Sequence, residues 1–239
     1  MFLEYAQRIL SERSRLQDSL GIRSKSVSGS VRITVAHLLA EYVLIPQAGR
    51  LRELYPDLHL DMLITDQTIN MAHERIDIVI RANITPADTL IARSLGKHGR
   101  ALYAAPGYLK KYGMPQKPDD LNSHSLIVNS ATPSQNQWRF LIDGQQTVCA
   151  MQGRLRVNTS SAVLSMALAG VGIARVNDVL GQEFARQGKL IPVLSDYCIP
   201  GEYSIYAAML SERHRAPKIR ATMEYLKTCF AAFLPQTGR

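Results

Sequence analysis

The chain has 239 residues, of which 46% are hydrophobic and 20% charged, a composition that excludes a disordered or fibrous protein. It contains no apolar run of about 18 residues or more, which excludes a membrane-spanning helix, and its first residues lack the apolar core and cleavage site of a signal peptide. The formal net charge is +8, which alone says little about partners and nothing about fold. We expect a cytoplasmic globular protein with one large domain or two lobes.

Cysteine and histidine usage indicates neither a cofactor nor a metal. The three cysteines (Cys149, Cys198 and Cys229) are far apart and odd in number, so we expect reduced thiols rather than a disulfide or a metal-binding spacing. The six histidines are scattered singly. No Gly-x-Ser-x-Gly or His-x-x-x-His motif occurs. We therefore predict no cofactor, no metal site and no enzymatic activity.

Basic residues are concentrated between residues 93 and 117, a stretch with no Asp or Glu. The stretch lacks the interleaved aromatic residues of a single-strand binder and the pattern of a groove-reading helix. We interpret its charges as a solvated face. They are Arg93, Lys97, Arg100, Lys110, Lys111 and Lys117.

The N-terminal residues 2–20 predict one amphipathic helix, ended by Gly21 and followed by a polar, flexible linker at 23–30. The apolar positions recur at helical steps and form a narrow seam that favours packing against a partner chain. They are Phe2, Ala6, Ile9, Leu16 and Leu20.

Residues 31–82 then alternate between strand and helix patterns. Strands are predicted at 31–36, 58–65 and 76–82, with a helix at 43–54 and a short helix through Met71 between them. Connections of this kind are right-handed crossovers, which produce a parallel sheet.

The pattern restarts near residue 100, which suggests a second α/β lobe joined to the first by crossing segments. Strands are predicted at 100–106, 125–129, 137–142, 147–158, 171–176, 189–194 and 203–210. Helices are predicted at 106–112, 159–169, 177–187 and 216–234.

Two glycines in the stretch ALAGVGIARVND raise the question of a nucleotide-binding loop. A dinucleotide fingerprint needs a strand, a glycine loop and a helix in that order, whereas Gly170 and Gly172 follow a helix and precede a strand. We therefore predict that they end the helix and form a tight turn.

Polar residues gather at two junctions of the predicted elements. Asn158, Thr159, Ser160 and Ser161 stand at the start of the 159–169 helix, where they fit either plain capping or an anion site. Thr34, Ala36 and His37 lie at the turn from the first strand into the next helix, at the edge where open α/β sheets bind ligands. One such junction in each lobe predicts a ligand held between the lobes.

The chain resembles the effector-binding domain of LysR-type transcriptional regulators in the order and spacing of several segments. They are GSVRITVAHLLAEYVLIPQAGRLRELYPDLHLDMLITD, ERIDIVIRAN, LIARSLGKHGRALYAAPGYLKKYGMPQKPDDLNSHSLI and GRLRVNTSSAVLSMALAGVGIARVNDVL. In addition, FLEYAQRILSE resembles the last part of that family's linker helix. The family's winged helix-turn-helix, which would precede the linker helix and contact promoter DNA, is absent from this sequence.

The resemblance implies a two-lobed, type 2 periplasmic-binding-protein-like α/β fold, with a mostly parallel sheet flanked by helices in each lobe. It divides the chain into part of the linker helix at 1–22, a linker at 23–30, one lobe of 31–101 with 209–239, and a second lobe of 102–208. It also implies homodimers or homotetramers whose arrangement changes when a small polar or anionic effector binds.

Carried over by position, the resemblance places the effector pocket at junction residues of both lobes. In the first lobe they are Thr34, Ala36, His37, Leu38, Thr65, Asp66, Arg81 and Asn83; in the second, Asn129, Ser130, Thr159, Ser160, Ser161, Arg175 and Val176. Two of these residues have alternative explanations, because a lone His37 is often a local hydrogen bonder and Arg81 could serve an ion pair between lobes. A solute-binding protein of a transport system remains the alternative function, against which the absent signal peptide argues.

Overall fold

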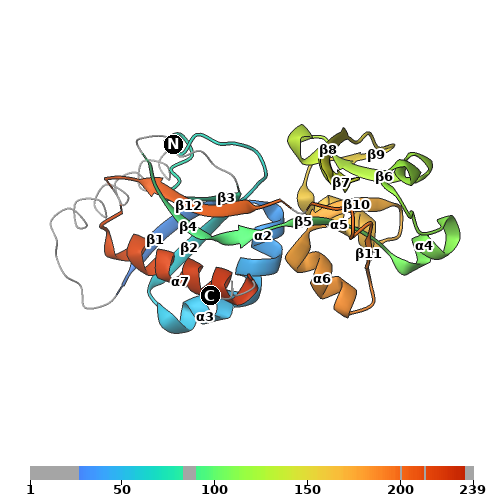
Figure 1. Ribbon diagram of the computed structural model, residues 1–239. Helices are drawn as coiled ribbons and strands as arrows, with labels where there is room; N and C mark the ends of the chain where they lie inside the picture. The colour runs from blue at the N-terminus through green and yellow to red at the C-terminus, as the bar shows by residue number, and fades with distance from the viewer. Residues whose placement is uncertain (1–26, 83–89, 200, 213, 235–239) are drawn as a thin grey trace, which may run out of the picture. The chain divides into compact units, whose positions relative to one another are not determined.

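The computed structural model describes residues 27–82, 90–199, 201–212 and 214–234, which fall into two compact units (Figure 1). The first unit combines the chain up to Leu95 with Ile205–Ala232, and the second takes Gly96–Ser204 and the residues from Phe233 on. The boundaries between the units fall within β4 (Leu90–His98), within β12 (Tyr203–Leu210) and at the last residue of α7 (Pro217–Phe233). The helix predicted at 2–20 lies outside the described residues.

The first unit is built on a sheet with the strand order β2-β1-β3-β12-β4. Strand β1 (Gly29–Val35) pairs in parallel with β2 (Leu58–Ile64) and with β3 (Ile78–Ala82), while β12 runs antiparallel to β3. The predicted strands are confirmed, but the sheet is mixed, because the C-terminal strand enters it in the opposite direction. Strand β4 was not predicted.

A continuous helical stretch follows β1. It consists of α2 (His37–Leu39), the π-helical η1 (Ala40–Leu44), the 3₁₀-helical η2 (Ile45–Gln47) and α3 (Ala48–Leu54). Pro46 has no N–H and cannot continue the α-helical bonding, which explains the irregular turns around it. The helix predicted at 43–54 therefore begins earlier, at His37.

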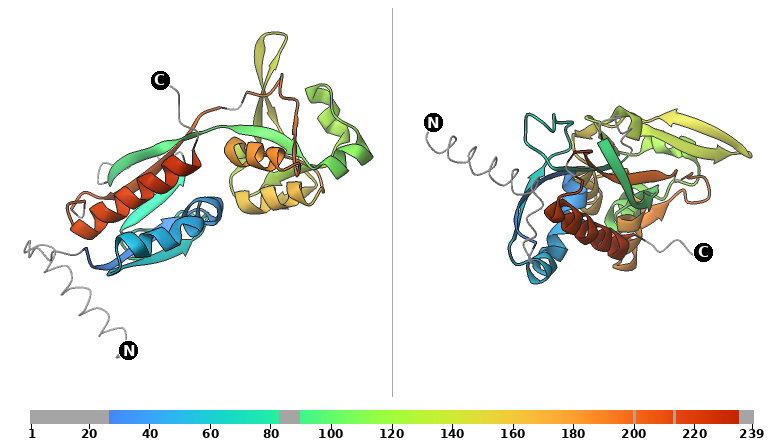
Figure 2. Two further views of the ribbon diagram at one scale, coloured as in Figure 1. Left: turned by 90° about the horizontal axis from the view of Figure 1, so that it is seen from below. Right: turned by 90° about the vertical axis from the view of Figure 1, so that its left-hand side faces the viewer.

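Helix α7 (Pro217–Phe233) covers the same sheet beside this stretch, as Figure 2 shows. The Tyr225 hydroxyl lies 3.5 Å from the Leu44 carbonyl oxygen. The core between sheet and helices is apolar and fully buried, with members at Val31, Ile33, Val35, Ile78, Ile80, Leu226 and Phe230.

The short helix predicted through Met71 is wrong. The chain there forms a turn over residues 71–75, which the Asn70 side chain stabilises by accepting the backbone N–H groups of Ala72 and His73 at 3.0 and 3.1 Å. Asn commonly replaces a helical start with a turn of this kind. Arg75 ends the turn with a φ of 55°.

The second unit has a mixed sheet with the order β11-β5-β10-β6-β9. Its bounds are β11 (Ile191–Val193), β5 (Arg100–Ala104), β10 (Ile173–Asn177), β6 (Leu126–Asn129) and β9 (Leu155–Val157). Strand β6 is parallel to both its neighbours, and β5 is antiparallel to both of its own. The helices are α4 (Pro106–Tyr112), η3 (Pro118–Ser123), η4 (Pro133–Asn136), α5 (Ser160–Leu168) and α6 (Asp178–Arg186).

A hairpin of β7 (Gln137–Ile142) and β8 (Gln145–Ala150) belongs to the second unit (Figure 2). Its turn is Asp143–Gly144, with φ values of 50° and 75° that match the type I′ turn of tight hairpins. The single strand predicted at 147–158 is therefore two strands, β8 and β9. The two strands belong to different sheets. Gly153 lies between them in the chain, and an added Cβ at this position would be 2.2 Å from the Leu126 carbonyl oxygen.

The structural role predicted for the two glycines after α5 is confirmed. Gly170 has a φ of 73°, its N–H donates to the Ala167 carbonyl, and the N–H of Val171 donates to the Met166 carbonyl. These two bonds form a Schellman motif, in which a left-handed glycine ends the helix. Gly172 allows a close approach, because an added Cβ would be 2.4 Å from the Ser125 carbonyl oxygen.

Candidate functional site

In the first unit, the predicted site residues lie at one edge of the sheet. The register aligns Val35 of β1 with Ile64 of β2 and with Ile80 of β3, so the carboxyl ends of three parallel strands coincide. Polar side chains lie at or just after each end: Thr34 and Arg81 are the second-last residues of β1 and β3, Asp66 follows β2, and the structure brings the three together.

Arg81 is held by three oxygens of neighbouring residues. Its Nη2 donates to Thr34 Oγ1 at 3.0 Å and to the Gln67 carbonyl at 3.3 Å, and Nη1 donates to the Ile80 carbonyl at 2.8 Å. Partial burial lowers the pKa of Arg81, and the charge of Asp66 opposes this shift. The guanidinium is therefore fixed in direction and stays charged at neutral pH.

Asp66 bonds the first turn of the helical stretch. Its Oδ1 accepts the His37 backbone N–H at 2.9 Å and lies 3.5 Å from His37 Nδ1. The His37 side chain is 44% exposed and that of Asp66 only 18%, so the imidazole is the accessible member of the pair. A carboxylate of the protein itself already lies at this helix start, which makes the position unfavourable for an anionic ligand group.

The other predicted residues of this edge have different roles. Thr65 accepts the Gln67 N–H through Oγ1 at 3.2 Å, and the Ala36 carbonyl accepts the Ala40 N–H at 2.9 Å. Leu38 is 6% exposed and belongs to the core. Asn83 lies outside the described residues.

In the second unit, predicted residues form the start of α5. Thr159 is the N-cap, and its Oγ1 accepts the Ala162 N–H at 3.1 Å, so for this residue the capping explanation holds. The Ser160 hydroxyl donates to Gln135 Oε1 at 3.3 Å and is partly buried. Ser161 follows in the first turn, also partly exposed.

Asn129 and Ser130 stabilise the loop after β6. The buried Asn129 accepts the N–H groups of Ala131 and Thr132 through Oδ1, and its backbone exchanges two hydrogen bonds with the side chain of Asn136. Ser130 donates through its N–H to the Val157 carbonyl at 2.7 Å. These contacts shape the loop beside the α5 start.

Arg175 and Val176 lie within β10 and are 4% and 2% exposed. The guanidinium of Arg175 lies 5.7 Å from the ring centre of Tyr203, and that of Arg100 lies 5.6 Å from the same ring. The His98 ring stacks on Tyr203 with 5.5 Å between ring centres. We call His98, Arg100, Arg175 and Tyr203 the Tyr203 cluster.

The Tyr203 cluster corrects one prediction and adds residues that were missed. Arg100 is 9% exposed and so does not belong to a solvated face, whereas the other five basic residues between 93 and 117 are exposed. The position of Arg100 in the otherwise apolar strand pattern RALYA could have indicated a buried arginine, as the position of Arg175 in IARVN could. His98 and Tyr203 gave no such signal.

Burial and positive charge act together on the titration of this cluster. Burial lowers the pKa of His98, and the charge of Arg100 lowers it further. The Gly99 carbonyl, which accepts a hydrogen bond from Nδ1 at 2.8 Å, partly opposes this shift. Burial also raises the pKa of the nearby Cys198 thiol. Cys149, Cys198 and Cys229 are free cysteines in the structure.

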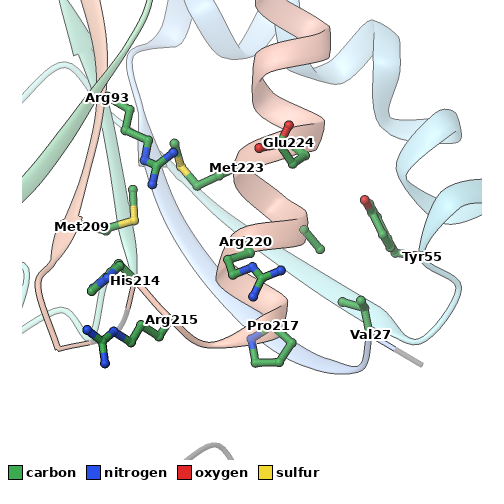
Figure 3. Close-up of a pocket in the computed structure, with 11 residues that line it drawn as sticks. Val27, Tyr55, Arg93, Met209, His214, Arg215, Pro217, Arg220, Met223 and Glu224 are labelled. Atoms are coloured by element: carbon green, nitrogen blue, oxygen red, sulfur yellow. The ribbon is translucent and has the colours of Figure 1, made fainter. Parts of the chain in front are cut away.

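A separate hollow of about 890 Å³ lies in the first unit, around the N-terminal half of α7 (Figure 3). None of the predicted site residues lines it. Within the described ranges, no group of three His, Cys, Asp or Glu side chains is placed to hold a metal ion. Nor is any helix there long and apolar enough to cross a membrane.

Comparison with known proteins places the chain among transcriptional regulators. It is 32% identical over 198 residues to the uncharacterized HTH-type transcriptional regulator YhjC of Escherichia coli, covering 82% of this chain and 66% of that protein. It is 30% identical over 224 residues to the HTH-type transcriptional activator TtdR of E. coli, covering 93% of this chain and 72% of that protein. The solved structure of CrgA, a LysR-type transcriptional regulator from Neisseria meningitidis, matches with a TM-score of 0.81 at 26% identity, covering 95% of this chain and 77% of that one.

These α/β units, with mixed sheets flanked by helices, have the type 2 periplasmic-binding-like fold. The family model described as the LysR substrate binding domain matches residues 24–231, and the chain belongs to that family. It therefore contains the effector-binding domain of a LysR-type regulator, and it spans 66% of the length of YhjC.

Proposed function

We propose that this chain is the effector-sensing and oligomerisation part of a transcriptional regulator, and that a small polar or anionic effector controls DNA-dependent transcription through it. The observation that carries the proposal is the grouping of Thr34, His37, Asp66 and Arg81 at the carboxyl edge of three parallel strands. Ligands of open α/β sheets bind at such edges. The α5 start of the second unit is a further candidate contact, which we take from the resemblance.

The charges of the two groups support a particular kind of ligand. Asp66 already bonds the helix start in the first unit, whereas α5 begins with the hydroxyl side chains of Ser160 and Ser161 beside its first backbone amides. A helix N-terminus carries about half a positive elementary charge. We therefore propose that α5 favours an anionic group of the effector, whereas Asp66 favours hydrogen-bond donor groups.

The alternative functions receive less support. The relatives reported above are named as transcriptional regulators rather than as transport proteins or enzymes. The contact of the whole protein with promoter DNA, through a helix-turn-helix outside this sequence, is part of the same proposal.

A thermal-shift screen of aromatic acids, amino acids and small organic acids tests this function. A ligand at 100 times its Kd should add about 2.7 kcal/mol to the free energy of unfolding. Calorimetric titration of a hit should then show about ten- to a hundredfold weaker binding to Ser160→Ala, which loses a hydrogen bond to a charged group. Thr34→Val should weaken binding similarly, because the buried Thr34 hydroxyl positions the Arg81 guanidinium.

Ser165→Ala is the matched control, because Ser165 is exposed on the same helix α5 one turn further on. Its affinity should equal that of the wild type. Unchanged affinity in both Ser160→Ala and Thr34→Val would place the effector site elsewhere.

A further inference from the structure

The hollow around α7 combines an apolar wall with basic side chains. Met209 of β12 and Met223 of α7, which are 1% and 4% exposed, contribute to its apolar lining. Arg93 of β4, Arg215 of the preceding loop and Arg220 of α7 line it from three different segments (Figure 3). Its volume of about 890 Å³ is within the range of small-molecule sites, which are mostly apolar with a few polar groups.

The basic side chains of the hollow are not neutralised by the described part of the protein. Among the described residues, no carboxylate forms an ion pair with Arg93, Arg215 or Arg220. Glu224 is the one acid among the described lining residues, and Lys227 Nζ lies 2.9 Å from its Oε1. The charge of Glu224 is therefore already shared with a lysine, and the hollow keeps an excess of positive charge.

We propose that this hollow is a second ligand site, which binds a small carboxylate with an apolar body. The apolar body would pack on Met209 and Met223, and the carboxylate would accept hydrogen bonds from the arginines, whose planar donor pairs match its geometry. The site is distinct from the strand-edge residues of the proposed function, because the two share no residue. A regulator with both sites would respond to two compounds.

Titration calorimetry of the full 239-residue chain tests the proposal with 2-naphthoate, which has a rigid aromatic body, and octanoate, which has a flexible aliphatic one. The matched neutral ligands are 2-naphthamide and octanamide. We expect at least one carboxylate to bind roughly tenfold or more tightly than its amide, the difference that one charge-assisted hydrogen bond produces.

Charge variants then test the residues. The triple variant Arg93→Gln, Arg215→Gln and Arg220→Gln should weaken binding by roughly tenfold or more, while Glu224→Gln should strengthen it by roughly twofold, since exposed charges act weakly. Arg139→Gln, an exposed change on β7 of the second unit, is the control and should leave the affinity unchanged.

Methyl NMR of the methionines locates the bound carboxylate. The signals of Met209 and Met223, assigned with Met→Leu variants, should shift during the titration. Ser160→Ala should leave the affinity unchanged, which separates this site from the α5 start. Equal binding of amide and carboxylate, full affinity in the triple variant, or shifts confined to other methionines would each overturn the proposal.

Discussion

The Tyr203 cluster shows how single residues allow positive charge to be buried in the second unit. Both guanidinium groups lie within about 6 Å of one aromatic ring, the range of cation–π attraction. Burial lowers the pKa of His98 most, Arg100 and Arg175 lower it further, and the Gly99 carbonyl and Asp178 oppose the shift. The imidazole is therefore held in its neutral form.

This arrangement predicts a loss of stability in mild acid. Burial lowers the pKa of His98 below its ordinary 6.5, so as the pH falls below about 6.5 the unfolded chain takes up a proton that the folded chain resists. The contribution of His98 to the free energy of unfolding is therefore complete above about pH 6.5 and decreases as the pH falls. It levels off below the pKa that His98 has in the folded state. Its slope cannot exceed about 1.4 kcal/mol per pH unit.

Urea unfolding of the wild type and His98→Gln between pH 5 and 8 measures this contribution. The free energy of unfolding of His98→Gln should depend less on pH than that of the wild type, whatever the stability of the variant at pH 8. His59→Gln, which changes an exposed histidine of β2, should keep it. Parallel curves for His98→Gln and the wild type would contradict the prediction.

Gly172 provides a second prediction at this scale. An alanine Cβ there would lie 2.4 Å from the Ser125 carbonyl oxygen, which itself accepts the Ile173 N–H at 2.8 Å. The backbone would have to move, and Gly172→Ala should lower the free energy of unfolding by roughly 2 kcal/mol. Gly107→Ala in α4 meets no atom within 4 Å and should be neutral or stabilising, as chemical denaturation of both variants can show.

Some site residues could be predicted from sequence because they lie in the last residues of strands. Thr34 and Arg81 were expected at the carboxyl ends of β1 and β3, and a parallel sheet brings such ends together. The Tyr203 cluster could not be predicted in this way. Its members come from β4, β5, β10 and β12, and their proximity depends on pairings between strands far apart in sequence.

At the scale of elements, α5 depends on its first residue. Thr159 Oγ1 accepts the Ala162 N–H at 3.1 Å, satisfying one of the free amides at the helix start. Thr159→Ala should therefore lower the free energy of unfolding by about 1 kcal/mol, and Thr159→Asp should restore it, because Asp caps as well as Thr. Thermal unfolding of both variants measures this difference, and equal loss in both would contradict the capping role.

The elements predicted best were those with a regular pattern. β1 and β2 follow such a pattern, whereas β4 has the sequence LIARSLGKH, whose exposed Arg93 and Lys97 interrupt any alternation. The false helix near Met71 had suitable residues, but Asn70 bonds the backbone into a turn instead. The Asn70 side chain competes with helical backbone hydrogen bonds, and hydrophobic periodicity cannot reveal such a competition.

The helix predicted at 2–20 favours self-association of the whole chain. A seam of Phe2, Ala6, Ile9, Leu16 and Leu20 is narrow enough for pairing with a second copy. We expect a dimer or larger species in sedimentation velocity at micromolar concentration. Deletion of residues 1–22 should shift the protein towards the monomer, and a wild type that is already monomeric would contradict the prediction.

The passage of β12 back into the first unit has a consequence for biosynthesis. In the order β2-β1-β3-β12-β4, the strand made last lies between two strands made more than a hundred residues earlier. While the ribosome is still adding the second unit, β3 therefore has an unpaired edge, and β4 lacks the neighbour that joins it to the sheet. The nascent first unit therefore stays incomplete until residues 203–233 emerge, and until then its strand edges can mispair or bind chaperones. Translation must be nearly finished before β4 and α7 can pack in their final positions.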